Sequence, residues 1–246
     1  MPTAKSVSER DGFHRPDGHR GSRSGVATAL GDLTWPEAEE LAADGAVLAV
    51  PVGATEQHGP HLPMATDTDV AMALAARLAA RRRDVIVAPP VGYGSSGEHA
   101  GFAGTISIGE DTLELMLVEL GRSAAETFRH ILFLSAHGGN DEPVTRATDR
   151  LRAESRDVIA WMPGHHPALV PAQALGLAPA ADPDIYTAPI TELMSVQRTP
   201  GVHAVSPDGV LGDPAGASAD EGAELLRWLE SQLLSVVSRW LQGMPA

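Results

Sequence analysis

The chain has 246 residues, of which 43% are hydrophobic and 20% are charged; its formal net charge is −14, and it contains no cysteine. These values are typical of a globular protein with one large domain or two small ones, and they argue against a nucleic-acid partner, because no element concentrates Lys and Arg. The absence of cysteine excludes disulfides and thiolate metal sites, and it fits a reducing compartment.

Membrane and export segments are not predicted. No stretch approaches eighteen uninterrupted apolar residues, and the N-terminus lacks the apolar core of a secretory signal, so we expect a cytoplasmic protein. Residues 1–26 are polar, rich in Gly, Ser and Arg, and bury too little apolar surface to offset their ordering entropy. We therefore expect a flexible N-terminal arm over 1–26 and a single domain over 27–246.

Helical and strand patterns alternate through most of that domain. The first helix is expected to begin at Thr34, which can cap it, and to stop at Gly45. Further helices are predicted over 69–82, 110–128 and 141–154, and from the capping box at 218–221 onward. Short apolar strands are predicted over 46–52, 85–89, 130–135 and 157–161.

Continuous apolar strands that alternate with amphipathic helices indicate a parallel sheet covered on both faces. The expected fold class is α/β, a three-layer sandwich with a mostly parallel central sheet between two layers of helices. In such sheets, functional sites lie beyond the carboxyl ends of the strands. Three polar loops follow strands directly, so we expect them to meet at one edge of the sheet.

The first of these loops contains several candidate metal ligands within fourteen residues. They are Glu56, His58, His61, Asp67 and Asp69. Imidazole nitrogens and carboxylate oxygens are ligands that Zn²⁺, Fe²⁺ and Mn²⁺ accept. The glycine and prolines between them favour a loop over a helix or a strand.

The other two loops add further reactive side chains. Glu98 and His99 follow the second strand, either as groups that orient metal ligands or as ordinary polar loop residues. His137 follows the third strand and precedes two glycines, which let the backbone approach a ligand closely. Asn140 is expected to cap the next helix, and a hydrogen bond to a metal-bound group is the alternative.

Three blocks of sequence together resemble the creatininase family of metal-dependent amidohydrolases. The first is Glu-Gln-His-Gly-Pro-His-Leu-Pro at 56–63, with Asp67 eleven residues after the glutamate. Residues 96–105 are similar to the second block of the family, and His-Gly-Gly-Asn at 137–140 is similar to the third. The resemblance implies the fold expected above and hydrolysis of an amide or lactam C–N bond.

The C-terminal part narrows the resemblance. Residues 204–218 are similar to one branch of the family, the creatininase-like peptidases of mycofactocin biosynthesis, which remove a C-terminal Val-Tyr dipeptide from a modified precursor peptide. The similarity to the family runs from about residue 30 to residue 242. His61 and Asp69 have no ligand role in the family pattern.

The resemblance implies a site with two divalent metal ions, which would be Zn²⁺, Fe²⁺ or Mn²⁺. Asp67 would bridge the two ions. Glu56 and His137 would complete one site, and His58 would contribute to the other. Such a pair of ions polarises the scissile carbonyl and generates hydroxide from water near neutral pH.

The chain departs from the family pattern in its last ligand. After the fifth strand, relatives carry an active-site histidine, matched here by His165, and a glutamate ligand, replaced here by Val170. Creatininases proper instead have a glutamate at the position of Gly139. The candidates to replace this ligand are Asp182, Asp184, Glu192 and His166. His165 and Glu98 are the expected catalytic residues.

The sequence thus predicts a metal-dependent hydrolase whose partner is a peptide or small amide substrate, and neither nucleic acid nor a membrane. Two alternatives stay open. One is an amidohydrolase of the same fold that acts on a small cyclic amide or a formamide. The other is a catalytically weakened homologue that serves as a binding or assembly subunit. Because relatives assemble as closed homo-oligomers, the resemblance also implies a homo-oligomer.

Overall fold

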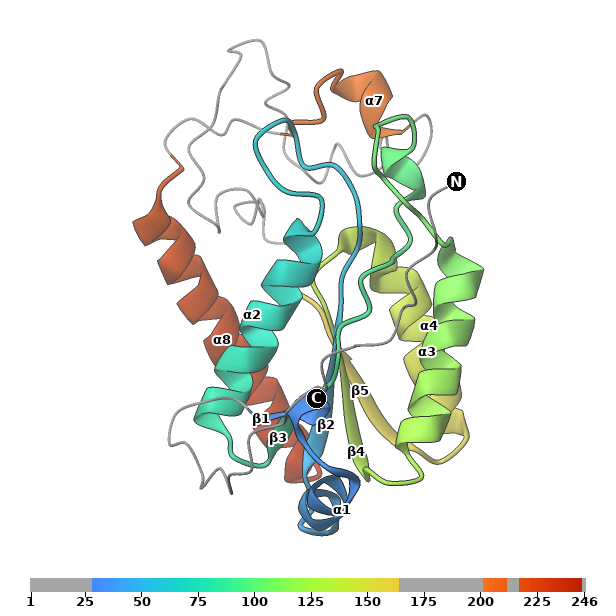
Figure 1. Ribbon diagram of the computed structural model, residues 1–246, viewed down its shortest axis with the longest axis vertical. Coiled ribbons are helices and arrows are strands. Elements are labelled where there is room, and N and C mark those ends of the chain that lie inside the picture. Colours follow the sequence, from blue (N-terminus) through green and yellow to red (C-terminus); the bar gives the residue numbers. More distant parts are fainter. Residues whose placement is uncertain (1–27, 164–200, 212–216, 245–246) are drawn as a thin grey trace, which may run out of the picture.

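The computed structural model describes residues 28–163, 201–211 and 217–244 (Figure 1). The arm expected at 1–26 lies outside these ranges, as does the stretch 164–200. Within them, no helix combines the length and the apolar character needed to cross a membrane.

Five parallel strands of the described chain form a central sheet in the order β1-β3-β2-β4-β5. They are β1 (Thr28–Ala29), β2 (Val47–Val52), β3 (Val85–Val87), β4 (His130–Ser135) and β5 (Asp157–Trp161). β2 lies in the middle and pairs with β4 along its whole length, from Val47 opposite His130 to Val52 opposite Ser135. Because both strands end at the same level, the loops that follow them start side by side.

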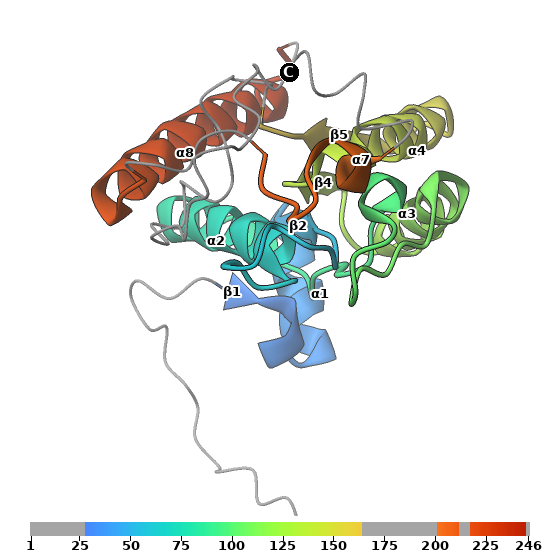
Figure 2. The same cartoon turned by 90° about the horizontal axis from the view of Figure 1, so that it is seen from above.

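Helices cover both faces of the sheet, as Figure 2 shows. One face carries α2 (Thr66–Arg81) and α8 (Ala219–Leu241), and the other carries α3 (Glu110–Ala124) and α4 (Asp141–Ala153). The remaining helices are α1 (Trp35–Ala43), α7 (Val202–Val205) and the 3-10 turns η1 (Leu30–Asp32), η2 (Gly97–His99) and η3 (Gly138–Asn140). α7 lies at the carboxyl edge of the sheet and α1 at the opposite end (Figure 1). The predicted three-layer α/β sandwich is confirmed.

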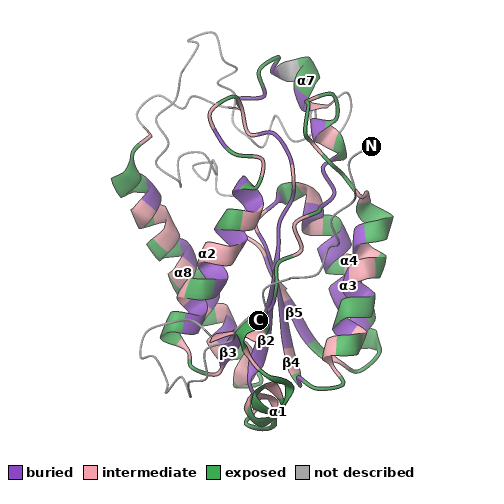
Figure 3. Cartoon of the chain, viewed as in Figure 1, coloured by how far each residue is buried: buried purple, intermediate pink, exposed green. Residues whose placement is uncertain are grey.

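Two apolar cores fill the space between the layers (Figure 3). Val47 and Ala49 of β2 pack toward α2 and α8, whereas Leu48, Val50 and Val52 pack toward α3 and α4. Every residue of β2 is buried, which explains why this strand reads as one uninterrupted apolar run. The sheet is therefore a rigid support for the loops at its carboxyl edge.

The predicted elements are found, and their bounds differ from the predicted ones by up to four residues. α2 begins at Thr66 and not at Asp69, so Asp67 lies in the first helical turn, where a carboxylate is favoured by the helix dipole. β3 ends at Val87 before two prolines, which cannot donate to a sheet. α3 ends at Ala124, four residues before the predicted end.

Candidate metal centre

The three polar loops meet at the carboxyl edge of the sheet, as predicted. Glu56 follows β2, Glu98 lies in η2 beyond β3, and His137 follows β4. The loop after β2 is closed by a hydrogen bond from the Glu56 N–H to the Met64 carbonyl, 3.1 Å long. This closure brings Glu56 back beside the start of α2, which carries Asp67.

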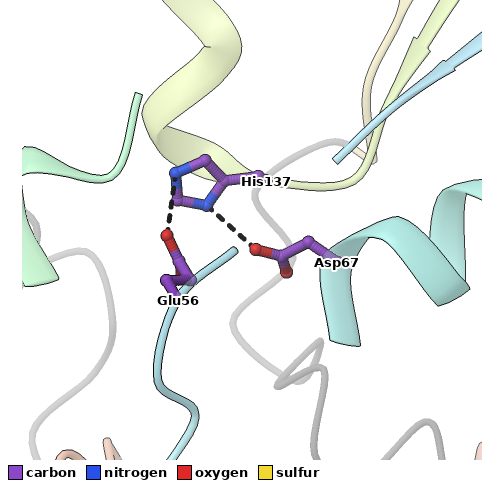
Figure 4. Close-up of side chains that lie close together, drawn as sticks. All are labelled: Glu56, Asp67 and His137. Carbon is purple, nitrogen blue, oxygen red and sulfur yellow. Dashed lines mark ion pairs between the residues drawn. The ribbon is translucent and has the colours of Figure 1, made fainter. Parts of the chain in front are cut away.

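Glu56, Asp67 and His137 form a buried group at this edge (Figure 4). One ligand atom from each residue lies within 4.8 Å of the other two. His137 lies between the two carboxylates: its Nε2 is 3.2 Å from Glu56 Oε2, and its Nδ1 is 3.2 Å from Asp67 Oδ2. The two ends of the loop after β2 thus contribute the carboxylates, and the distant loop after β4 contributes the histidine.

The chemistry of this group fits a divalent metal ion. Glu56 Oε2 and Asp67 Oδ2 are buried and have no hydrogen-bond partner among the described residues. Burying polar atoms in this way is costly unless a partner compensates for the lost water. A single ion can bind only one nitrogen of the His137 ring, and the three ligand atoms, one from each residue, lie within 4.8 Å of one another.

His58 extends the group on the other side of Asp67. Its Nε2 lies 3.1 Å from Asp67 Oδ1 and 3.7 Å from Glu56 Oε1. The two oxygens of Asp67 therefore face different histidines, an arrangement suited to a carboxylate that bridges two ions. His137 Nε2 is also 2.9 Å from the Ser95 carbonyl, to which it can only donate, so Nδ1 carries the lone pair whenever this ring is neutral.

The close packing perturbs the titration of these groups. Burial raises the pKa of Glu56 to about 8, although the charge of His137 opposes this. Burial also disfavours ionised Asp67, but its pairing with His137 and His58 outweighs burial and holds its pKa well below the usual range. For His137, burial is outweighed by Asp67 and Glu56, which raise its pKa to about 10. His58 has a raised pKa because Asp67 outweighs burial.

Glu98 approaches the group through space that Gly139 leaves open. Its Oε1 lies 3.7 Å from His137 Nε2. A Cβ atom on Gly139 would lie 2.2 Å from the Ser95 carbonyl oxygen, 2.5 Å from Glu98 Oε1 and 2.5 Å from His137 Nε2. The glycine at this position, where creatininases proper have a glutamate, is therefore needed for the packing around His137.

Asn140 does not cap α4, contrary to the prediction, since its side chain makes no capping hydrogen bond. Its Oδ1 accepts a hydrogen bond from the Ser95 N–H, and its Nδ2 donates to the Gly53 carbonyl, each 2.9 Å long. The side chain is fully buried, and a buried amide must satisfy its hydrogen-bonding groups, which the two backbone partners do. Asn140 thus fastens the loops after β2 and β3 to the loop after β4.

The other predicted site residues lie elsewhere. Asp69 is exposed on α2, away from the buried group. Both ring nitrogens of His61 are buried without a hydrogen-bond partner in the described chain, but His61 is not part of the group. His165, Val170 and the candidate replacement ligands lie outside the described residues.

Most of the chain is similar to proteins of one known family. The family model "Creatininase: Creatinine amidohydrolase" matches residues 31–171. A protein of Mycolicibacterium smegmatis (strain ATCC 700084 / mc(2)155) named mycofactocin precursor peptide peptidase is 43% identical over 217 residues, which are 79% of this chain and 85% of that protein. The chain belongs to the creatininase family.

Two further matches support this assignment. A mycofactocin precursor peptide peptidase of Mycobacterium tuberculosis (strain ATCC 25618 / H37Rv) is 40% identical over 239 residues, covering 86% of this chain and 92% of that protein. The crystal structure of a creatinine amidohydrolase (creatininase) superposes with a TM-score of 0.69 at 23% identity, covering 89% of this chain and 99% of that one. The structural match shows that this member of the family shares the creatininase fold.

Proposed function

We propose that this chain is a metal-dependent peptidase that cleaves the mycofactocin precursor peptide and releases its C-terminal Val-Tyr dipeptide. The observation that carries the proposal is the buried Glu56–Asp67–His137 group in a creatininase-family chain that is 40–43% identical to proteins named for this activity. A divalent ion held by such ligands would supply the carbonyl polarisation and the activated water that peptide hydrolysis requires.

Glu56, Asp67 and His137 would hold one divalent ion, and Asp67 together with His58 would contribute to a second. An ion in this position would polarise the scissile carbonyl and lower the pKa of the attacking water. Asp67 is suited to the shared position because its low pKa keeps it ionised, with one oxygen toward each histidine.

Glu98 and His165 are the proposed catalytic residues. Glu98 is the carboxylate beside His137 whose side chain keeps some exposure, 19%, whereas Glu56 and Asp67 are almost fully enclosed. A carboxylate that reaches both the buried group and solvent can accept a proton from water and pass it to the leaving amine. His165 is proposed on the family resemblance alone.

The test is mass spectrometry of a synthetic peptide ending in Val-Tyr, incubated with full-length protein loaded with Zn²⁺, Fe²⁺ or Mn²⁺. Wild type should release the dipeptide, while Glu56→Gln and Asp67→Asn should lose at least about a hundredfold in rate, because each removes a charged ligand. Asp69→Asn, an exposed acidic position on the same helix, should cleave as wild type does. Hydrolysis of cyclic amides or formamides, without cleavage of the peptide, would favour an amidohydrolase that acts on small amides. No hydrolysis of peptides or of small amides would indicate a binding or assembly subunit.

A further inference from the structure

Gln57 lies between two proposed metal ligands in the sequence, and its amide group is held in a fixed orientation. Its Oε1 accepts a hydrogen bond of 2.8 Å from the Gly59 N–H. Its Nε2 lies 2.8 Å from His99 Nδ1. The reverse orientation of the amide would place its N–H groups against the Gly59 N–H, so the backbone determines which end faces His99.

This orientation sets the tautomer of His99. An amide N–H can only donate, so His99 Nδ1 accepts, and the ring proton must be on Nε2. Nε2 in turn lies 3.2 Å from Glu56 Oε1. The two oxygens of Glu56 are therefore in different surroundings: Oε1 faces the N–H of His99, and Oε2 faces His137 with no hydrogen-bond partner among the described residues.

A turn from the C-terminal part of the chain packs against the same glutamine. In this turn, Asp208 Oδ1 accepts hydrogen bonds from the Ser206 hydroxyl (2.8 Å) and the Val210 N–H (3.1 Å). Gly209 has a φ of +80°, and a Cβ on it would lie 1.7 Å from Gln57 Oε1. A side chain at this position would collide with the amide of Gln57, so the turn requires glycine here.

We propose that Gln57 and His99 are positioning residues that hold Glu56 with Oε2 free for a metal ion, and that the turn 206–210 braces them. The proposal rests on the proposed function insofar as Glu56 is a metal ligand. It gives the C-terminal turn, about 150 residues from the ligand in the sequence, a direct role in shaping the site.

The tautomer can be tested in the metal-free, full-length protein. Nitrogen-15 NMR of the imidazole rings distinguishes a proton on Nε2 from one on Nδ1, and the His99 signals are assigned by their loss in His99→Gln. Wild type should show His99 protonated on Nε2. Gln57→Met, which keeps the size but removes the donor, should give a mixture of tautomers, whereas Gln232→Met on the exposed face of α8 should leave the signals unchanged. A proton on Nδ1 in wild type, or no change in Gln57→Met, would overturn the proposal.

The effect on the site is tested by Zn²⁺ affinity, measured by competition with a chelator. Gln57→Met and His99→Met should bind Zn²⁺ about 10–100-fold more weakly than wild type, as is usual when a group that orients a ligand is removed. His99→Gln, which keeps an N–H near Glu56, should recover part of the loss. Affinity equal to wild type in both methionine variants would refute the proposal.

Gly209→Ala should weaken Zn²⁺ binding in the same direction, because its methyl group displaces the amide of Gln57. Gly243→Ala is the matched control: this glycine also has a positive φ, +72°, but a Cβ there meets nothing within 4 Å. If wild type and Glu56→Gln both fail to bind Zn²⁺, the proposed function fails. If Glu56→Gln alone loses Zn²⁺ while Gln57→Met and Gly209→Ala bind as wild type does, only the positioning role is wrong.

Discussion

The substitution Gly139→Ala probes how tightly the loops are packed around His137. The added methyl group would lie 2.2 Å from the Ser95 carbonyl oxygen and 2.5 Å from Glu98 Oε1 and His137 Nε2. The carbonyl belongs to the backbone of Ser95, whose own N–H is hydrogen-bonded to Asn140, so it cannot move without shifting the loop after β3. We therefore expect the methyl group to displace His137 from Ser95 and from the carboxylates.

Overpacking of this kind costs about 1–3 kcal/mol in a filled site. In a chain of this size, each kcal/mol lowers the melting temperature by about 2–4 °C, so a decrease of roughly 2–12 °C is expected. The neighbouring substitution Gly138→Ala is the control, because a Cβ there meets nothing within 4 Å. It should change stability by less than about 0.5 kcal/mol.

The assays are thermal unfolding of both metal-free variants and their Zn²⁺ affinity. Gly139→Ala should be less stable than Gly138→Ala and should bind Zn²⁺ at least about tenfold more weakly, because His137 is displaced. Equal melting temperatures and equal affinities for the two variants would refute the packing described around His137.

Two further predictions follow from the same site. The pKa values of Glu56 and His137 are raised to about 8 and about 10, so both side chains carry protons at neutral pH that a metal ion must displace. Zn²⁺ affinity should therefore fall as the pH is lowered from 8 to 6. The expected decrease is up to about tenfold per pH unit for each proton released. Calorimetry in buffers of different ionisation enthalpy measures this release, and an affinity independent of pH would contradict it. Asn140→Leu removes the partners of the Ser95 N–H and the Gly53 carbonyl and should cost about 1–3 kcal/mol for each group left unpaired. Denaturant unfolding of the metal-free protein checks this, and a total loss below about 1 kcal/mol would show that these hydrogen bonds do not fasten the loops.

The layers and the meeting point of the loops could be predicted from the sequence because they depend on local patterns. β2 and β4 are continuous apolar runs, and parallel strands necessarily bring their carboxyl ends to one edge. The sequence alone therefore predicts that Glu56 and His137, which follow two such strands, lie at the same edge of the sheet. The predicted start of α2 is three residues too late, because Thr66, Asp67 and Thr68 closely follow a proline and are typical of a loop, yet the first turn of a helix also accepts such residues.

The packing around the ligands could not be predicted in this way, because it depends on contacts between distant residues. Gln57 stands between two predicted ligands, yet its role becomes visible only through His99, 42 residues away, and through Gly209. Asn140 has the sequence context of a helix cap, and only the fold reveals that two backbone groups of other loops surround it. In the sequence, Gly139 stands where creatininases proper have a glutamate ligand. The structure shows that Glu98 occupies the space that a side chain on Gly139 would need.

The measurement that tests the central claim most directly is the metal content of the full-length protein purified without chelator, paired with release of the Val-Tyr dipeptide. Wild type and Asp69→Asn should each contain at least one divalent ion per chain and should cleave the peptide. Asp67→Ala, which removes the carboxylate placed between His58 and His137, should lose both the metal and the activity. Full metal content together with full hydrolysis in Asp67→Ala would contradict the account.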